Sequence, residues 1–415
     1  MSKDKTKARI IGAIKLLLVA GLMTWVFTGV QWRDRLIRNG ANGKPQETIG
    51  KIAGDWKAEP VTFRPLVGDQ YGDAIEIRNG KLQDGTDADV TAGLPTYFEQ
   101  LNISLFLLGA LSYGLTIVVS AIRWWRILLM NNLRVTAWEA QRFTWMGIFF
   151  NNVVPGATGG DLVKALYIMK HCPGARIEAL VSVIVDRVMG LGSLALLAAI
   201  VVLFDLEHFG KMAFIIWAVL LGVGLVGVVA FSRRLRELVR LKHLLNRLPN
   251  KLASPLKKVD QAIFYYRSHA AGVIGWTVFG MIIHVLACTS VLLMGKALGV
   301  GLPNLDYYVL VPIANLVSAI PLGPNGWGLG ELSYRTLFGS VGASALPGVA
   351  NAEHVMGTRG VALSVLHRMH VTLWSSVGGV LTFFEKDKVT RADIEHEVEL
   401  EGHEEDLDPE RDGKS

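Results

Sequence analysis

The sequence predicts an all-α polytopic membrane protein with about six transmembrane helices, two re-entrant helical hairpins that enter from opposite sides, and a small β-rich extracytoplasmic insert. Three observations predict this class. First, 51% of the 415 residues are hydrophobic and only 19% are charged, which is typical of membrane proteins. Second, apolar runs long enough to cross a bilayer recur along the chain. Third, two segments rich in glycine and proline interrupt apolar stretches that are individually too short to span.

The charge is distributed unevenly along the chain. The net charge of +6 comes from basic segments beside apolar runs and is offset by an acidic C-terminal tail. This arrangement indicates membrane topology and argues against a nucleic-acid-binding surface. Cys172 and Cys288 lie far apart, one in polar and one in apolar sequence. Neither a disulfide framework nor a zinc site is therefore expected.

The N-terminal segment, residues 1–30, combines a basic start with an apolar run from Ile10 to Val30. This run is long enough to span a membrane and has no convincing signal-peptide cleavage site, so we expect a retained first helix. The lysine and arginine residues before the run place the N-terminus in the cytoplasm.

Residues 31–98 form the one sizeable polar region between the predicted spans. They contain the strand-like pieces Pro60–Arg64 and Ala74–Arg78, the second followed by Asn79-Gly80, which is a strong hairpin signal. We expect a β-rich insert that is too small to form a stable core alone and that leans on the membrane domain. A partly ordered loop is the alternative.

The transmembrane domain covers residues 99–384. After the first helix it contains five apolar runs of spanning length, namely 103–122, 179–204, 212–231, 273–298 and 360–384. The run 103–122 ends in the sequence RWWR at 123–126, which is expected to anchor the helix at the cytoplasmic interface. Residues 131–142 are interpreted as a short interfacial helix.

Two further segments lie on the predicted cytoplasmic side. Residues 232–267 are strongly basic with regularly spaced leucines, which indicates either an amphipathic helix on anionic lipid or a plain connecting helix. The tail 385–415 is acidic and almost free of apolar residues, so we expect it to be disordered and cytoplasmic.

The two interrupted stretches are Asn151–Lys164 and Pro321–Glu331. Irregular backbone at membrane depth survives where it is buried in protein or lines a wet cavity. Paired broken helices in two halves of a chain are also the best sequence indication of a transporter's binding site. We therefore interpret both as re-entrant hairpins, the first entering from the cytoplasm and the second from outside. The residues expected to shape these hairpins and their flanks are Pro155, Gly156, Gly160, Asp161, Asp186, Pro321, Pro324, Gly326, Gly328, Gly330 and Glu331.

Charged residues within the apolar segments are the functional candidates, because a charge in a bilayer is costly unless it faces a partner or water. Asp161 and Glu331 each begin the helix after a turn, where an acid favours the helix dipole. The remaining cations and amides are expected to meet a lipid headgroup. These candidates are Asn151, Asn152, Lys164, Arg187, Arg335 and Arg368.

Each of these assignments has a plainer alternative. The charges, Asp186 and Arg187 among them, could pair with one another only to hold the helices together. Asn151 and Asn152 could cap the hairpin. His367 and His370 lie on one helix face and could bind a metal, but no third ligand is evident and packing histidines are commoner. We expect no metal and no cofactor.

No enzymatic motif stands out in the sequence. Metalloprotease, nucleophile-elbow and phosphate-loop patterns are missing from it. We therefore expect that the protein is not an enzyme.

The same residues resemble a known family. Similar motifs in similar order occur in the flippase-like integral membrane domain of lysylphosphatidylglycerol synthases, which also occurs as stand-alone proteins. The matching pieces, over roughly residues 100 to 384, are RWWRILL at 123–129, NNVVP at 151–155, GDLVKA at 160–165, DRVMGL at 186–191, IPLGPNGWGLGE at 320–331, and His367-Arg368. The family more often has Glu where this chain has Asp161 and Asp186, and the insert 31–98 is not typical of it.

The resemblance implies that the protein moves a lipid, anionic or glycosylated, between membrane leaflets. We expect it in the cell (inner) membrane, and the charge distribution predicts that both chain ends are cytoplasmic. Because only the acidic tail follows the last predicted span, aminoacyl transfer is not expected. The alternative is a non-transporting scaffold or partner subunit for a lipid-linked glycosyltransferase, another lipid-modifying enzyme or an envelope-assembly system. A membrane enzyme acting on lipid headgroups is the third and weakest possibility.

Overall fold

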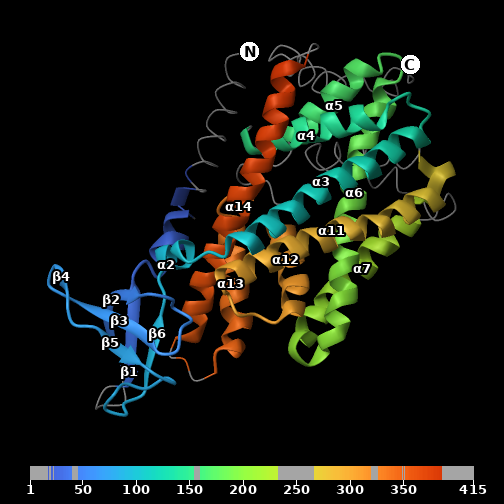
Figure 1. Cartoon of the computed structure of the whole chain (residues 1–415). Coiled ribbons are helices and arrows are strands. Elements are labelled where there is room, and N and C mark those ends of the chain that lie inside the picture. Colours follow the sequence, from blue (N-terminus) through green and yellow to red (C-terminus); the bar gives the residue numbers. More distant parts are fainter. Residues whose placement is uncertain are drawn as a thin grey trace. The chain divides into compact units, whose positions relative to one another are not determined.

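The structure is a computed structural model of the whole chain (Figure 1), and it divides into two compact units. It describes residues 17, 20–21, 23–39, 45–153, 159–231, 266–318, 326–347, 349 and 351–385. The first unit comprises Met1–Thr116, Leu197–Ala213 and His284–Val371, and the second comprises Ile117–Leu196, Phe214–Ile283 and Thr372–Ser415. Each unit is described by itself.

The first unit carries the antiparallel β-sheet that the sequence predicts. Its order is β4-β3-β2-β1-β6, with β5 also paired to β3. The strands are β1 (Asp34–Asn39), β2 (Pro45–Ala53), β3 (Val61–Val67), β4 (Gln70–Tyr71), β5 (Ile75–Ile77) and β6 (Ala88–Thr91). The two predicted strand-like pieces correspond to β3 and β5. Asn79 and Gly80 both have positive φ, and the backbone groups of Arg78 and Lys81 bond across them, as a two-residue hairpin requires.

The sheet is tied to the following helix by one buried carboxylate. Asp34 is only 3% exposed and accepts hydrogen bonds from the backbone N–H of Ile52 and of Gly93, both at 2.7 Å. It also accepts one from the Thr96 hydroxyl at 2.7 Å, on helix α2 (Leu94–Glu99). A buried acid with three donors needs no ion pair.

The sheet segment contacts helices of its own unit, as expected for an insert too small to stand alone. The Gln31 N–H donates to the Thr358 hydroxyl at 3.2 Å. Arg359 donates through Nε to the Tyr97 hydroxyl at 3.0 Å and through Nη1 to the Val300 carbonyl at 2.8 Å. Residues 40–44 of this segment lie outside the described part of the chain.

The rest of the described chain is almost wholly helical. The elements are α3 (Ile103–Met130), α4 (Ala137–Val153), α5 (Gly159–His171), α6 (Arg176–Val201), η1 (Val202–Asp205), α7 (Leu206–Phe231), η2 (Arg267–His269), α11 (Ala270–Leu298), α12 (Asn304–Ser318), α13 (Leu329–Gly342), η4 (Ala343–Ala345) and α14 (Ala352–Phe384).

Three predicted spans are confirmed as helices of membrane-crossing length and hydropathy within the described residues: Ile103–Met130, Arg176–Asp205 and Ala270–Leu298. Helices α7 and α14 cover the predicted spans 212–231 and 360–384. The described apolar part of α7 is only Met212–Gly222, and α14 carries several charged and histidine side chains. Residues 10–16, 18, 19 and 22 of the predicted first helix lie outside the described residues, as do residues 232–265 of the predicted basic segment 232–267 and the tail from 386.

Two local predictions around the end of α3 are wrong. The predicted anchor at 123–126 is partly buried. Arg123 and Trp124 are 4% and 0% exposed, Trp125 is half-buried and Arg126 is exposed. The helix continues to Met130, and its pitch sends successive side chains to different faces. The predicted helix 131–142 begins only at Ala137. A capping box, in which Thr136 and Glu139 bond each other's backbone N–H at 2.8 and 3.2 Å, fixes that start.

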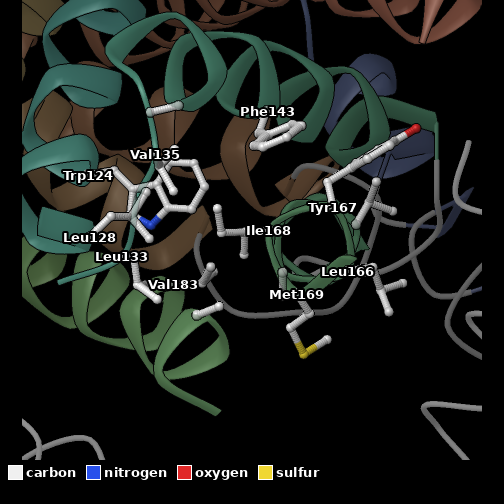
Figure 2. Packing of buried hydrophobic residues seen from close by; sticks show 14 of the residues in the cluster. Trp124, Leu128, Leu133, Val135, Phe143, Leu166, Tyr167, Ile168, Met169 and Val183 are labelled. Atoms are coloured by element: carbon white, nitrogen blue, oxygen red, sulfur yellow. The ribbon is translucent and has the colours of Figure 1, made fainter. Parts of the chain in front are cut away.

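Helices α4 and α5 form an antiparallel hairpin in the second unit. Phe143 stacks on Tyr167 with ring centroids 5.7 Å apart, and Glu139 lies 3.2 Å from His171. Figure 2 shows Ile168 of α5 on the side of Trp124 and Val135, and Leu166 on the opposite side. The predicted turn at Pro155 and Gly156 lies between the described residues 153 and 159.

Helices α12 and α13 pair similarly in the first unit. Tyr307 and Phe338 contact each other edge to face at 5.8 Å. A Cβ on Gly326, whose φ is +71°, would lie 2.5 Å from the Ser318 carbonyl oxygen, so the two chain segments approach closely there. Pro321 and Pro324 lie outside the described residues. The membrane depth and entry side of both hairpins stay predictions.

Candidate functional site

A buried ion-pair cluster joins three helices of the second unit. Asp186 on α6 accepts a hydrogen bond from Arg123 Nε on α3 at 2.9 Å and one from Lys164 Nζ on α5 at 3.2 Å. Arg123 also donates to the Asp186 backbone carbonyl at 3.2 Å. The three residues are 4%, 6% and 7% exposed, for Arg123, Lys164 and Asp186 respectively. We call these three residues the Asp186 cluster.

The Asp186 cluster carries more positive than negative charge. Two cations share one carboxylate, and Arg123 Nη1 is buried without a hydrogen-bond partner among the described residues. Trp124 covers one side, because Lys164 Nζ lies 3.8 Å from its ring centroid and its Nε1 donates to the Ser182 hydroxyl at 3.2 Å. Such a site favours a further anion, since a buried uncompensated charge is costly.

The lack of a side chain at Gly280 of α11 leaves room for the Arg123 guanidinium. A Cβ on Gly280 would lie 2.8 Å from Arg123 Nη1 and 2.4 Å from the Ser193 hydroxyl. The Ser193 hydroxyl donates to the Thr277 carbonyl at 2.6 Å, so α6 and α11 are bonded directly where the guanidinium lies. Any side chain at 280 would push this arrangement apart.

Asp186 and Arg187 do not pair with each other. Adjacent helical residues point about 100° apart, and Arg187 instead pairs with Asp161 at the start of α5. This second pair is far more open, with side-chain exposures of 36% and 30%. Both residues are neighbours of the Asp186 cluster along the chain. Arg187 follows Asp186 on α6, and Asp161 lies one turn before Lys164 on α5.

Asn151 caps the hairpin, which is the plainer of its two predicted roles. Its Oδ1 accepts the Gly160 N–H at 2.9 Å and so satisfies a free donor at the start of α5. Asn152 donates to the Ile148 carbonyl at 3.5 Å. A Cβ on Gly160 would lie 2.0 Å from the Gly147 carbonyl oxygen, so α4 and α5 touch backbone to backbone there.

A second ion-pair cluster lies in the first unit, where α13 meets α14. Glu331, 1% exposed, accepts the Gly328 N–H at 2.6 Å and pairs with Arg368. The predicted capping role of Glu331 is thus confirmed, and the same carboxylate also forms the ion pair with Arg368. Arg368 also donates to the Gly326 carbonyl at 3.0 Å and lies 4.8 Å over the Trp327 ring. Gly330 makes this possible, because a Cβ there would lie 2.3 Å from Arg368 Nη2.

His367 and His370 lie beside this cluster on α14. Their ring centroids are 4.8 Å apart, and Tyr113 of α3 meets both edge on, at 5.8 and 4.7 Å. They pack as the commoner alternative predicts. No group of three metal-ligating side chains occurs in the described part of the chain.

Arg335, the remaining predicted candidate, has other partners than the two clusters. It donates through Nη1 to the Trp25 carbonyl at 3.3 Å, and its guanidinium lies 5.3 Å over the Trp25 ring. The structure therefore assigns the six headgroup candidates to different surroundings: Lys164 and Arg187 at or next to the Asp186 cluster, Arg368 with Glu331, Arg335 with Trp25, and the two asparagines at the α4–α5 hairpin.

Sequence reasoning missed Arg123, which it assigned to the membrane surface. The available signal was that the apolar sequence resumes after RWWR as ILLM at 127–130, which predicts a helix that continues past Arg123. Ser182 and Gly280 carried no signal of their own, since a small residue in an apolar helix is ordinary.

Comparison with known proteins places these helices in a family. The family described as the lysylphosphatidylglycerol synthase TM region matches residues 91–353, more than half of the chain. The match begins at the last sheet residues and stops in the first turn of α14, so most of the β-sheet and Arg368 lie outside it.

One curated relative is a UPF0104 membrane protein of Pyrococcus horikoshii. It is 29% identical over 136 residues, which make up 32% of this chain and 41% of that protein. This chain thus spans less than half the length of that relative. No solved structure matches the chain. The protein is a membrane protein and belongs to the family of the lysylphosphatidylglycerol synthase transmembrane region.

Proposed function

We propose that the protein is a lipid flippase or transporter that moves an anionic or glycosylated lipid between the leaflets of a cell membrane. The observation that carries the proposal is the Asp186 cluster, where two cations and one anion are enclosed by helices of a membrane protein. Charges in such a place are expensive and usually serve an ion or substrate pathway. The family context supports a lipid as the substrate, since a lysylphosphatidylglycerol synthase acts on a membrane lipid.

The proposed path runs from the open pair to the closed one. A headgroup phosphate first meets Arg187, where it competes with Asp161 for the guanidinium. The phosphate then reaches the Asp186 cluster, where Lys164 and Arg123 supply N–H donors and the excess positive charge. Arg–phosphate bonds are strong and directional, so at each step a cation can exchange its carboxylate partner for the phosphate.

The two hairpins would let the headgroup cross while its acyl chains stay in lipid. Broken helices aim backbone N–H groups at anionic substrates in other transporters. The predicted entry of α4–α5 from the cytoplasm and of α12–α13 from outside is part of this proposal. In this proposal the protein has no catalytic residue, both termini are cytoplasmic, and its only obligatory partner is the lipid.

The test is transbilayer movement in proteoliposomes. The purified full chain is reconstituted with fluorescently labelled phosphatidylglycerol, phosphatidylcholine or glucosylceramide, and the fraction of label in the outer leaflet is followed by dithionite quenching. We expect at least one anionic or glycosylated lipid to move faster than in empty vesicles. Arg187→Gln and Lys164→Met should slow this movement, whereas Arg134→Gln, at an exposed position, should not.

Equal rates in filled and empty vesicles for all three lipids would contradict the proposal. Folding of each variant is checked by monodispersity in detergent before reconstitution. A scaffold that recruits a glycosyltransferase would show no lipid movement and would be insensitive to Lys164→Met.

A further inference from the structure

A polar pocket lies in the first unit and shares no lining residue with either ion-pair cluster. Its volume is about 500 Å³, within the range of roughly 300–1,000 Å³ that small-molecule sites occupy. The walls come from the helical segment 23–28, from α13 and from the first turn of α14. The lining side chains used below are Trp25, Arg335, Thr336, Asn351, Glu353 and His354.

Arg335 is held in place on one wall. Its Nη1 donates to the carbonyl oxygens of Trp25 and Val26 at 3.3 and 3.5 Å, and it lies over the Trp25 ring. Gly29 leaves it room, because a Cβ there would come within 2.1 Å of Arg335 Nη2. The guanidinium is therefore preorganised, which reduces the entropy lost on binding.

The β-sheet fixes the rim of the pocket. Asn351, just before α14, donates through Nδ2 to Glu47 Oε1 on β2 at 3.3 Å, and Glu47 in turn pairs with Arg35 at 2.5 Å. The backbone carbonyl of Asn351 accepts the His354 N–H at 2.8 Å, so the turn that carries Glu353 and His354 is fixed as well. The sheet thus holds one lining residue of the pocket, Asn351, in place through Glu47.

The charge of the lining argues for a neutral ligand. One guanidinium, Arg335, faces the pocket together with one carboxylate, Glu353. The charged pair behind the rim, Arg35 with Glu47, is balanced too. A phosphate or carboxylate would gain one cation but meet one like charge, so an anion gains little here. The Asp186 cluster, with its excess cation, shows the opposite balance.

The side-chain chemistry specifies the class of neutral ligand further. Trp25 is 57% exposed, so its indole offers an apolar face beside an amide, a hydroxyl, a carboxylate and a guanidinium. A pyranose ring needs both parts: its axial C–H groups pack on an aromatic face, and its hydroxyl groups donate to carboxylates and accept from N–H groups. An acyl chain would leave these polar groups without hydrogen bonds.

We propose that this pocket binds a neutral saccharide unit, with Trp25 as the stacking platform and Arg335, Asn351 and Glu353 as hydrogen-bonding partners. The unit is either the headgroup of a glycosylated membrane lipid or a free sugar on the extracytoplasmic side. The site goes beyond the proposed transport, and sugar binding there stands whether or not lipid movement is found.

The test is direct binding to the full chain in phosphatidylcholine nanodiscs. Saturation-transfer difference NMR is recorded with glucose, galactose, mannose, N-acetylglucosamine and maltose, and separately with monoglucosyl diacylglycerol in the nanodisc. We expect saturation of sugar ring C–H protons for at least one probe. Trp25→Ala should weaken that binding roughly tenfold, equivalent to about 1.4 kcal/mol. Trp32→Ala, at another exposed tryptophan (50% exposed), should leave it unchanged.

The variant Glu353→Gln separates a sugar from an anion and barely changes the shape of the site. It should weaken sugar binding several-fold through loss of a charged acceptor, and inorganic phosphate should not bind to either form. Binding of a free sugar identifies a soluble ligand, and binding of the glycolipid alone identifies a headgroup. The proposal is overturned if no probe binds, if Trp25→Ala has no effect, or if phosphate binds and Glu353→Gln strengthens it.

Discussion

Arg123 and Asp186 lie 63 residues apart in the chain, yet Arg123 Nε donates to Asp186 Oδ1 at 2.9 Å inside one helical unit. Lys164 reaches the other carboxylate oxygen at 3.2 Å. One aspartate therefore compensates two buried cations. This makes Asp186 the residue on which the electrostatic balance of α3, α5 and α6 depends, and it leads to a clear ranking of substitutions.

Asp186→Ala should be the most destabilising change in this cluster. It leaves Arg123 and Lys164 buried without an acid, which typically costs about 3–5 kcal/mol. Lys164→Met should cost less, because Arg123 and Asp186 still neutralise each other. Asp161→Ala breaks a half-exposed pair and should cost less than about 1 kcal/mol. The free energy of unfolding, measured by chaotrope titration in detergent micelles, gives the order. Equal losses for Asp186→Ala and Asp161→Ala would contradict this account.

Gly160→Ala should destabilise the α4–α5 hairpin by forcing the two helices apart. The new Cβ would lie 2.0 Å from the Gly147 carbonyl oxygen, and backbone cannot move aside as a flexible side chain can. Overpacking of this kind costs about 1–3 kcal/mol. Gly222→Ala on α7 is the matched control, since nothing lies within 4 Å of its Cβ position. It should be neutral or stabilise by up to about 1 kcal/mol through helix propensity. Thermal unfolding of the two variants in the same detergent compares them.

Glu331 should tolerate glutamine better than alanine. Glutamine keeps an acceptor for the Gly328 N–H but loses the charge that pairs with Arg368, whereas alanine loses both. We expect the free energy of unfolding to fall by about 3–5 kcal/mol for Glu331→Ala and by clearly less for Glu331→Gln. A double-mutant cycle of Glu331→Gln with Arg368→Met should show coupling between the two positions. Strictly additive effects would mean that the two side chains act independently.

The stability of the β-sheet should respond to the charge of Asp89. Burial, with Asp87 adding to it, raises the pKa of the Asp89 carboxyl. The folded sheet therefore holds this proton more tightly than the unfolded chain. The resulting stabilisation is fully present below the unfolded pKa of roughly 4 and is lost as the pH rises through the folded pKa. Asp89→Asn should thus increase amide hydrogen-exchange protection of β1 and β6 at neutral pH, with the gain vanishing toward pH 3.

Asp84 in the same segment gives the control of opposite sign. Thr86 donates its backbone N–H to Asp84 Oδ1 at 2.9 Å, and this bond lowers the pKa of Asp84. The contribution of Asp84 is present above the unfolded pKa and is lost as the pH falls through the folded pKa. Asp84→Asn should therefore reduce protection at neutral pH. The same direction of change in both variants would show that charge is not the cause.

Much of the secondary structure could be predicted because its causes are local. The spans at 103–122, 179–204 and 273–298 follow from apolar length alone, and the Asn79-Gly80 turn follows from two residues that tolerate positive φ. Glu331 was predictable as a helix-start acid for the same reason. The start of α4 at Ala137 also has a local cause, the capping box of Thr136 and Glu139. The prediction of a helix from residue 131 overlooked it.

The sequence by itself determined that this is a helical membrane protein with a β-rich insert, two apolar segments interrupted by glycine and proline, and a small set of charges within apolar segments. Only the tertiary structure decided how those charges pair: Asp186 with Arg123 and Lys164, Arg187 with Asp161, and Glu331 with Arg368. The physical reason is that apolar length and turn chemistry act between near neighbours in the chain. An ion pair depends on which helix faces pack together, and on glycines such as Gly280 and Gly330 that leave room for a guanidinium.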